Sequence, residues 1–367
     1  MSSYPNHWAG ISGTIEAGET PLQAAQRELQ EETSLAQIVE SQGGLFVNVP
    51  YLSKRTQETR IIRVYPHVVL VPETTVELEL RGTEHDSFKF ITVQELLDMN
   101  ESDCVPGLVQ AFHHATHGKF DNQIPESVKQ WASDEEHGAS VMTRNALALL
   151  EQEDDDSMMK VRALQISILR PSMVSIVNVM QHIVANGKEA SVTMESTLGK
   201  DLQDSVALGQ ATIRDLVSNK GGRLLKIATY SRSGTLVKIL APFVEECEIV
   251  CSQSTPGNEG ELMAQQDLKN HDHLRWVPDE EMEELLANGK FDALLVGSDC
   301  ILPDQMVNKV GTKRLCEIAQ KEGTVVCCCA DKWKIWEDVF PPPIEEDLFE
   351  LVPLKLVSKL LVPGLTS

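Results

Sequence analysis

The chain has 367 residues, of which 42% are hydrophobic and 24% charged, and its formal net charge at pH 7 is −23. This length favours two or three domains with cores of their own, and the composition is that of a globular protein. The acidity repels phosphate backbones, and no apolar run approaches the roughly 20 residues of a membrane-spanning helix, so we expect no nucleic-acid and no membrane partner.

The first strongly patterned segment, TPLQAAQRELQEET, predicts a helix that begins after Thr20 and has Pro21 in its first turn. Residues three and four apart are neighbours on a helix, so Glu28, Glu31 and Glu32 share one face. Like charges at this spacing repel each other. The segment is therefore either a solvated acidic face or a site for a cation.

Strand-like runs follow this helix, a second helix is expected in SFKFITVQELL, and the polar stretch HATHGKFDNQIP predicts a linker. Helices dominate from residue 126 and are interrupted by the acidic stretch EQEDDDS. After Gly221 and Gly222, apolar strands alternate with helices, which is the pattern of a parallel sheet with crossover connections. Ligands of such sheets bind beyond the carboxyl ends of the strands.

The eight cysteines follow no metal-ligand spacing, and Cys327, Cys328 and Cys329 are consecutive in an apolar run. Alternation along a buried strand would point these three side chains to opposite faces. We expect small core residues of a protein in the reducing cytoplasm. The start, MSSYPNHWAG, lacks the basic residues and apolar core of a secretory signal, which favours the same cytoplasmic location.

Over a wider window, GTIEAGETPLQAAQRELQEETSL resembles the Nudix box. The resemblance implies a hydrolase of a nucleoside diphosphate linked to another group, with Mg²⁺ or Mn²⁺ bound by Glu28, Glu31 and Glu32. It also implies that Arg27 acts with these three glutamates in catalysis and holds the carboxylates of helix and loop, with Glu19 as its partner. Eight positions of the box are in register: Gly13, Glu19, Arg27, Glu28, Leu29, Glu31, Glu32 and Leu35.

The sequence departs from the Nudix pattern at two places. Ser34 stands where the family has Gly, which removes a residue suited to ending the helix in a left-handed conformation. Only about a dozen residues precede Gly13, whereas a Nudix domain normally begins with one or two strands, so we expect a trimmed domain or an incomplete start. The box does not supply the general base; Glu73, Glu77 and Glu79 are candidates, each of which is more ordinarily surface charge.

The second half of the chain carries a different resemblance. Five motifs occur in the order found in the alpha, beta and delta subunits of translation initiation factor 2B, a family that also contains methylthioribose-1-phosphate isomerase and ribose-1,5-bisphosphate isomerase. The resemblance implies a helical part followed by a Rossmann-like sheet. The motifs are DEEHGAS (134–140), TYSRSGT (229–235), VGSDCIL (296–302), VNKVGTKRL (307–315) and FELVP (349–353).

The isomerases of this family use a Cys and an Asp, and the motifs place Ser231 and Asp279 at those positions. Serine is a poorer nucleophile than a thiol at neutral pH, and QSTP stands where the family has an Arg for phosphate. Asp279 is alternatively a helix N-cap. The remaining anchor positions imply binding of a sugar phosphate or nucleotide, together with Ser231 and Asp279, by Ser233, Gly234, Thr235, Asn308 and Lys309.

The sequence thus predicts an α/β protein with a Nudix α/β/α sandwich in residues 1–122, a helical part in residues 123–220 and a Rossmann-like parallel sheet in residues 221–367. We expect a hydrolase of a phosphorylated small molecule, fused to a regulatory domain that forms a homodimer. One alternative is a non-catalytic member of the initiation-factor family with a degenerate Nudix segment. A sugar-phosphate isomerase is a third hypothesis, which the replacement of the thiol by Ser231 disfavours.

Overall fold

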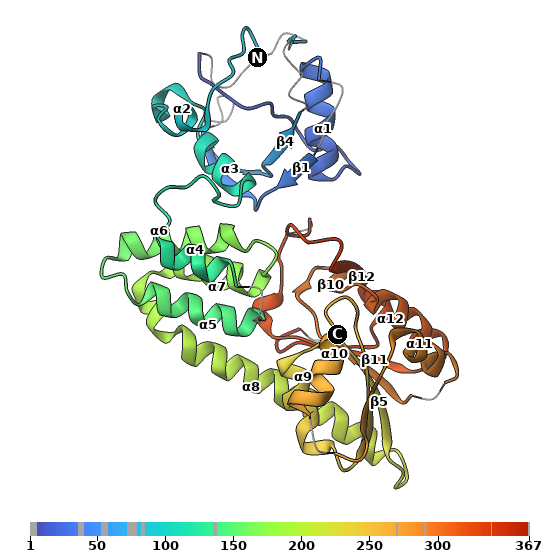
Figure 1. Cartoon of the computed structure of the whole chain (residues 1–367). Helices are drawn as coiled ribbons and strands as arrows, with labels where there is room; N and C mark the ends of the chain where they lie inside the picture. The colour runs from blue at the N-terminus through green and yellow to red at the C-terminus, as the bar shows by residue number, and fades with distance from the viewer. Residues whose placement is uncertain are drawn as a thin grey trace. The chain divides into compact units, whose positions relative to one another are not determined.

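The chain folds into two compact units in the computed structural model (Figure 1). The first unit comprises Met1–Asp134 together with Leu164–Pro171, and the second comprises Glu135–Ala163 and Ser172–Ser367. The residues that the structure describes are 6–35, 40–52, 58–71, 79–81, 85–134, 138–268, 271–289, 291–338 and 340–365.

The helix α1 (Pro21–Glu32) begins and ends through local hydrogen bonds. Thr20 is its N-cap: the Thr20 side chain accepts a hydrogen bond from the Gln23 amide, and the Gln23 side chain accepts one from the Thr20 amide. The helix ends at Thr33, whose backbone is extended with φ −135°. The predicted helix, with Thr20 at its cap and Pro21 in its first turn, is confirmed.

The described strands of the first unit form two antiparallel pairs. In one, β1 (Glu40–Gly43) pairs with β4 (His67–Leu70); in the other, β2 (Val47–Leu52) pairs with β3 (Thr59–Val64). The short helix α2 lies in the expected SFKFITVQELL segment, with a second capping box between Thr92 and Glu95. Besides α1, the described helices of this unit are α2 (Val93–Leu97), α3 (Leu108–Ala115) and α4 (Glu126–Ala132), and η1 (Glu101–Asp103) is a 3-10 turn.

The second unit begins with helices, as the sequence predicts for the residues after 126. They are α5 (Ala139–Leu150), α6 (Asp156–Leu169, whose residues from Leu164 belong to the first unit), α7 (Val174–Asn186) and α8 (Lys188–Ser218). None of the described helices is both long enough and apolar enough to cross a membrane.

A six-stranded parallel sheet forms the centre of the second unit, in the order β13-β11-β8-β5-β6-β7. Helices follow the strands as the sequence predicts: α9 (Gly234–Leu240), α10 (Glu259–Leu262), α11 (Asp279–Ala287) and α12 (Thr312–Lys321) (Figure 1). The strands are β5 (Leu225–Tyr230), β6 (Cys247–Ser252), β7 (Leu274–Val277), β8 (Ala293–Val296), β11 (Val325–Cys329) and β13 (Lys359–Leu361).

Both faces of this sheet are buried. Cys328 belongs to the hydrophobic cluster on one face, and Cys327 and Cys329 belong to the cluster on the other. All eight cysteines are buried and free of disulfides, so the prediction of small core residues is confirmed. A smaller antiparallel sheet lies beside these elements and joins β12 (Phe349–Pro353), β10 (Gln305–Lys309) and β9 (Cys300–Ile301).

Candidate functional site

Arg27 fastens the loop before α1 to the helix. Its Nε donates to Glu19 Oε1 at 2.8 Å, and its Nη2 donates to Glu19 Oε2 at 3.0 Å and to the Thr14 carbonyl at 2.9 Å. The expected Arg27–Glu19 partnership is therefore present as a two-point contact. The hydrogen bond from Arg27, followed by that from the Glu16 amide, lowers the pKa of Glu19 to about 2.

Glu28 lies against the loop at Gly13. Arg27 Nη1 donates to Glu28 Oε1 at 2.7 Å, and the Glu28 side chain is only 15% exposed. A Cβ atom at position 13 would lie 1.7 Å from Glu28 Oε1, so the carboxylate fills the space that any other residue's side chain would take. The first glycine of the box is thus explained by the first glutamate of the helix.

The other two glutamates have different surroundings. Glu31 is 60% exposed, with its Oε2 3.7 Å from Arg27 Nη1. Glu32 is only 8% exposed, and its Oε2 lies 2.8 Å from Nε2 of His85. The single acidic face predicted from the sequence is therefore divided: Arg27 contacts the Glu28 and Glu31 carboxylates, and His85 contacts the Glu32 carboxylate.

The chemistry of these side chains fits a hard divalent cation, because carboxylate oxygens are the donors that Mg²⁺ and Mn²⁺ prefer. The space at Gly13 holds the Glu28 carboxylate, and Glu32, one turn later, is also mostly buried. Within the described part of the chain, no three His, Cys, Asp or Glu side chains already converge as a metal-binding group. The glutamates therefore fit the cation in kind, and at least one of them must move before all three can share it.

Ser34, the departure from the box, has a structural use. Its amide donates to the Glu79 carbonyl, and its Oγ accepts from the Glu79 amide, each at 2.9 Å. Because the helix ends in an extended residue, Thr33, no left-handed glycine is needed. The expectation that Ser34 weakens a left-handed cap is wrong for this reason.

The candidates for a general base fare differently. Glu73 and Glu77 lie outside the described residues. Glu79 is exposed, and its backbone is hydrogen-bonded to Ser34 at the end of α1. Its role as a general base stays a prediction. His85 was missed by the sequence reasoning, because a single histidine in GTEHDSF carries no spacing signal and its contact with Glu32 spans 53 residues.

In the second unit, residues 231–235 and Asp279 lie directly after the parallel strands β5 and β7, whereas Asn308 and Lys309 end the antiparallel strand β10. Ser231 follows β5 in a left-handed conformation with φ 64°, and its amide donates to Ser254 Oγ at 2.7 Å. Ser233 is the N-cap of α9, where its Oγ accepts from the Leu236 amide at 3.3 Å. Gly234 and Thr235 occupy the first turn of that helix.

Asp279 organises the loop that follows β6. Its two oxygens accept hydrogen bonds of 2.6 to 2.9 Å from the hydroxyls of Ser252 and Thr255 and from the amides of Ser254 and Thr255. Burial alone would raise the pKa of Asp279, and these hydrogen bonds outweigh that effect and lower it. The N-cap of α11 is Pro278, so the alternative that Asp279 caps this helix is wrong.

Lys309 and Asn308 are buried and bonded within the protein. Lys309, 6% exposed, donates from Nζ to Glu259 Oε1 at 2.5 Å and to the Pro256 carbonyl. The second oxygen of Glu259 is buried, with no hydrogen-bond partner in the described part of the chain. Asn308 donates to Thr312 Oγ1 at 3.0 Å and so stabilises the start of α12.

Glu350, in β12, also contacts the start of α12. Its Oε1 accepts from the amides of Gly311 at 2.8 Å and Lys313 at 2.9 Å. A carboxylate of the protein thus takes the position at a helix N-terminus that suits an anion.

The structure brings most of the predicted ligand residues to one edge of the sheet. Ser254 connects Ser231 to Asp279 through two hydrogen bonds, and Lys309 bonds the same loop at Pro256. One polar residue at this edge was missed. Asp299 follows β8, the neighbour of β5, and lies 3.8 Å from Lys334 Nζ; its place directly after the buried run ALLVGS was the available signal.

Comparison with known proteins identifies both halves of the chain. The family model described as the initiation factor 2 subunit family matches residues 134–352, and the model of the NUDIX domain matches residues 2–112. No curated protein sequence matches the chain.

Solved structures resemble the second half. The translation initiation factor eIF-2B of Pyrococcus horikoshii OT3 is 18% identical with a TM-score of 0.52, covering 65% of this chain and 94% of its own. The 5-methylthioribose 1-phosphate isomerase of the same organism is 14% identical with a TM-score of 0.45, covering 64% and 82%. The first likeness shows that the parallel-sheet region has the Rossmann-like fold of that initiation factor.

Proposed function

The chain belongs to the initiation factor 2 subunit family, and from this premise we propose that its N-terminal NUDIX domain is a metal-dependent hydrolase and that the family region regulates it. The substrate is a nucleoside diphosphate linked to another group. The observation that carries the proposal is the set of contacts around Arg27, because this side chain joins Glu19 of the loop and Glu28 of the helix as the box requires.

Each side chain of the box has a definite task in this proposal. Glu28, Glu31 and Glu32 hold Mg²⁺ or Mn²⁺, which when bound polarises the pyrophosphate and favours attack by water. Arg27, 2.7 Å from Glu28 and 3.7 Å from Glu31, offsets the repulsion between these two carboxylates before a cation arrives. One water is consumed, one bridging P–O bond breaks, and both products leave with a phosphate.

We assign the second unit a binding role for a sugar phosphate or nucleotide. Ser231, Ser233, Gly234 and Thr235 lie together after β5 and support this role. Lys309 is held by Glu259, so an anionic ligand has to displace that carboxylate first. Substitution of Glu259 therefore tests whether this carboxylate competes with an anionic ligand for Lys309.

The same region is our candidate for forming a homodimer. Apolar side chains are exposed on three of its helices: Val141 on α5, Met158 and Val161 on α6, and Val192 on α8. Pairing of two copies would cover such side chains. A mass of one chain by light scattering at micromolar concentration would rule the dimer out. The free, buried cysteines support the proposed cytoplasmic location.

A non-catalytic member of the family is the second candidate function. It is favoured by the partners of the second site, where Asp279, Glu259 and Glu350 accept hydrogen bonds from the protein itself. Isomerase chemistry is disfavoured, because Ser231 replaces the thiol and the four hydrogen bonds to Asp279 stabilise its ionised form against proton transfer.

The deciding experiment incubates the purified full chain with Mg²⁺ and a panel of nucleoside diphosphate derivatives. Release of a nucleoside monophosphate from at least one compound, abolished by chelation of the metal, is expected. Absence of turnover across the panel with both Mg²⁺ and Mn²⁺ would favour the non-catalytic alternative. Conversion of a sugar 1-phosphate into its ketose would instead support the isomerase hypothesis.

A further inference from the structure

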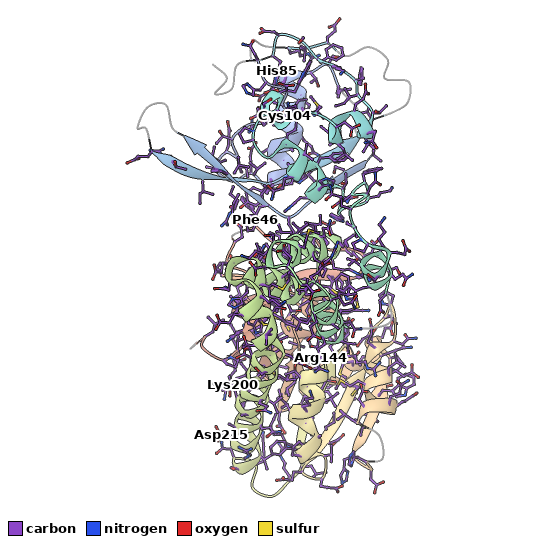
Figure 2. The ribbon with its side chains drawn as sticks, turned by 90° about the vertical axis from the view of Figure 1, so that its left-hand side faces the viewer. Phe46, His85, Cys104, Arg144, Lys200 and Asp215 are labelled. Atoms are coloured by element: carbon purple, nitrogen blue, oxygen red, sulfur yellow. The ribbon has the colours of Figure 1, made fainter. Side chains whose placement is uncertain are left out.

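Glu32 differs from the other two box glutamates in having a histidine partner. Its side chain is 8% exposed, and its Oε2 lies 2.8 Å from Nε2 of His85, which Figure 2 labels in the first unit. An ionised carboxylate only accepts hydrogen bonds, so the Nε2–H group of His85 donates a hydrogen bond to Glu32. The buried Glu32 carboxylate thus accepts a hydrogen bond from a residue 53 positions later in the chain.

The backbone of residues 79–81 pairs with the end of α1. The Arg81 amide donates to the Glu32 carbonyl at 2.7 Å, and Leu80 forms an isolated bridge with Thr33. Two further hydrogen bonds join Ser34 to Glu79. Residues 79–81 are therefore paired with the end of α1, including the carbonyl of Glu32 itself.

We propose that His85 is a positioning residue that orients the Glu32 carboxylate toward the divalent cation; this inference rests on the proposed hydrolase function. His85 holds Oε2, whereas Oε1 has no hydrogen-bond partner among the described residues and is the oxygen left for the cation. Carboxylate ligands are commonly held by such a second hydrogen bond, and its loss typically weakens metal affinity by about 10 to 100-fold.

Two substitutions separate the hydrogen bond from the bulk of the ring. In His85→Gln the amide nitrogen stands near the place of Nε2 and can still donate to Glu32. In His85→Asn the shorter side chain places its nitrogen near Nδ1, out of reach. The matched control is His273→Gln, which changes an exposed histidine of the second unit.

The readout is binding of Mn²⁺ alone to the full chain, followed by electron paramagnetic resonance of the free ion. We expect about a 10 to 100-fold weaker affinity in His85→Asn and near wild-type affinity in His85→Gln and His273→Gln. Wild-type affinity in His85→Asn, or an equal loss in both His85 variants, would overturn the positioning role.

A double-mutant cycle keeps the test decisive if His85→Asn also disturbs folding. Once Glu32→Gln has removed the metal ligand, adding His85→Asn should cause no further loss of Mn²⁺ affinity, whereas a purely structural effect would add to it. If the wild-type protein binds Mn²⁺ but hydrolyses none of the compounds, the hydrolase proposal is refuted. The order of Mn²⁺ affinities among wild type and the two His85 variants then still tests the positioning role. Wild-type protein that binds no Mn²⁺ at millimolar concentration overturns both.

Discussion

In α1 three carboxylates crowd into two turns and share two partners, Arg27 and His85, whereas at the carboxyl edge of the parallel sheet each carboxylate has donors of its own. Asp279 accepts four hydrogen bonds from one loop, Glu259 binds Lys309, and Glu350 accepts two amides at the start of α12.

The difference bears on what each region can bind. A carboxylate loses hydration on burial and needs compensating donors, which the sheet edge supplies in full at Asp279. The glutamates of α1 have fewer donors and keep capacity for a cation. On the proposed assignment, the first region suits a metal ion, and an anion would enter the second only in competition with the protein's own carboxylates.

The largest expected effect concerns the metal ligands. Glu31→Gln combined with Glu32→Gln should reduce Mg²⁺-dependent hydrolysis to the rate without enzyme, because two of three proposed ligands lose their charge. Relief of repulsion, worth a few tenths of a kcal/mol, opposes the loss of the contacts with Arg27 and His85, so the metal-free protein should remain folded. The measurement is product release by chromatography, with Glu58→Gln, an exposed residue of the same unit, as control. Unchanged turnover in the double variant would contradict the ligand assignment.

Acid should affect the two units at different pH. Burial lowers the pKa of His114 from 6.5 to about 4, so the unfolded first unit binds a proton that the folded unit does not. The contribution of His114 to the stability of this unit is fully present above about pH 6.5, and about 3 kcal/mol of it is lost when the pH falls to 4. For Asp292 of the second unit, burial would raise the pKa, but Arg223 and Lys220 lower it to about 2, so that contribution is lost only below about pH 4.

Hydrogen exchange followed by mass spectrometry reports the two units separately. Between pH 6.5 and 4 we expect protection to decrease in the first unit and to persist in the second. His114→Gln should make the protection of the first unit depend less on pH. The control, His182→Gln in the second unit, should not change that dependence. Equal loss of protection in both units over this range would show that the histidine is not responsible.

At the sheet edge, Glu259→Gln should leave the buried Lys309 without its counter-charge. Since Glu259 is 32% exposed, water screens part of the loss, and we expect destabilisation of about 1 to 3 kcal/mol. Removing the competing carboxylate should also enlarge the rise in melting temperature caused by millimolar inorganic phosphate. Glu261→Gln, in the same helix, is the control; a phosphate response equal to wild type would mean that Glu259 does not occupy an anion site.

The smallest effect is expected at Gly13. In Gly13→Ala the new Cβ would meet Glu28 Oε1 at 1.7 Å, and the carboxylate, as the end of a flexible side chain, should move aside. Stability should change by less than about 1 kcal/mol, and Mn²⁺ affinity should fall, because the carboxylate of a proposed ligand is displaced. Gly10→Ala, whose Cβ would find its nearest atom at 3.9 Å, should bind Mn²⁺ normally.

Much of the fold was predictable because the interactions that define it are local or periodic. The capping box of Thr20 and Gln23 spans three residues, and the contact between Arg27 and Glu19 spans eight within one motif. The alternation of apolar strands and helices after Gly222 is enough to indicate a parallel sheet, and alternation along β11 places Cys328 opposite its two neighbours.

The partners of the site residues were decided only by tertiary structure. His85 reaches Glu32 across 53 residues, Glu259 reaches Lys309 across 50, and the donors to Asp279 come from a loop about 25 residues earlier. Such contacts depend on which loops meet at a helix end or a sheet edge, and no spacing in the sequence encodes that meeting. The sequence therefore determined which charged groups the protein has at its two sites, and folding determined which of them remain available to a ligand.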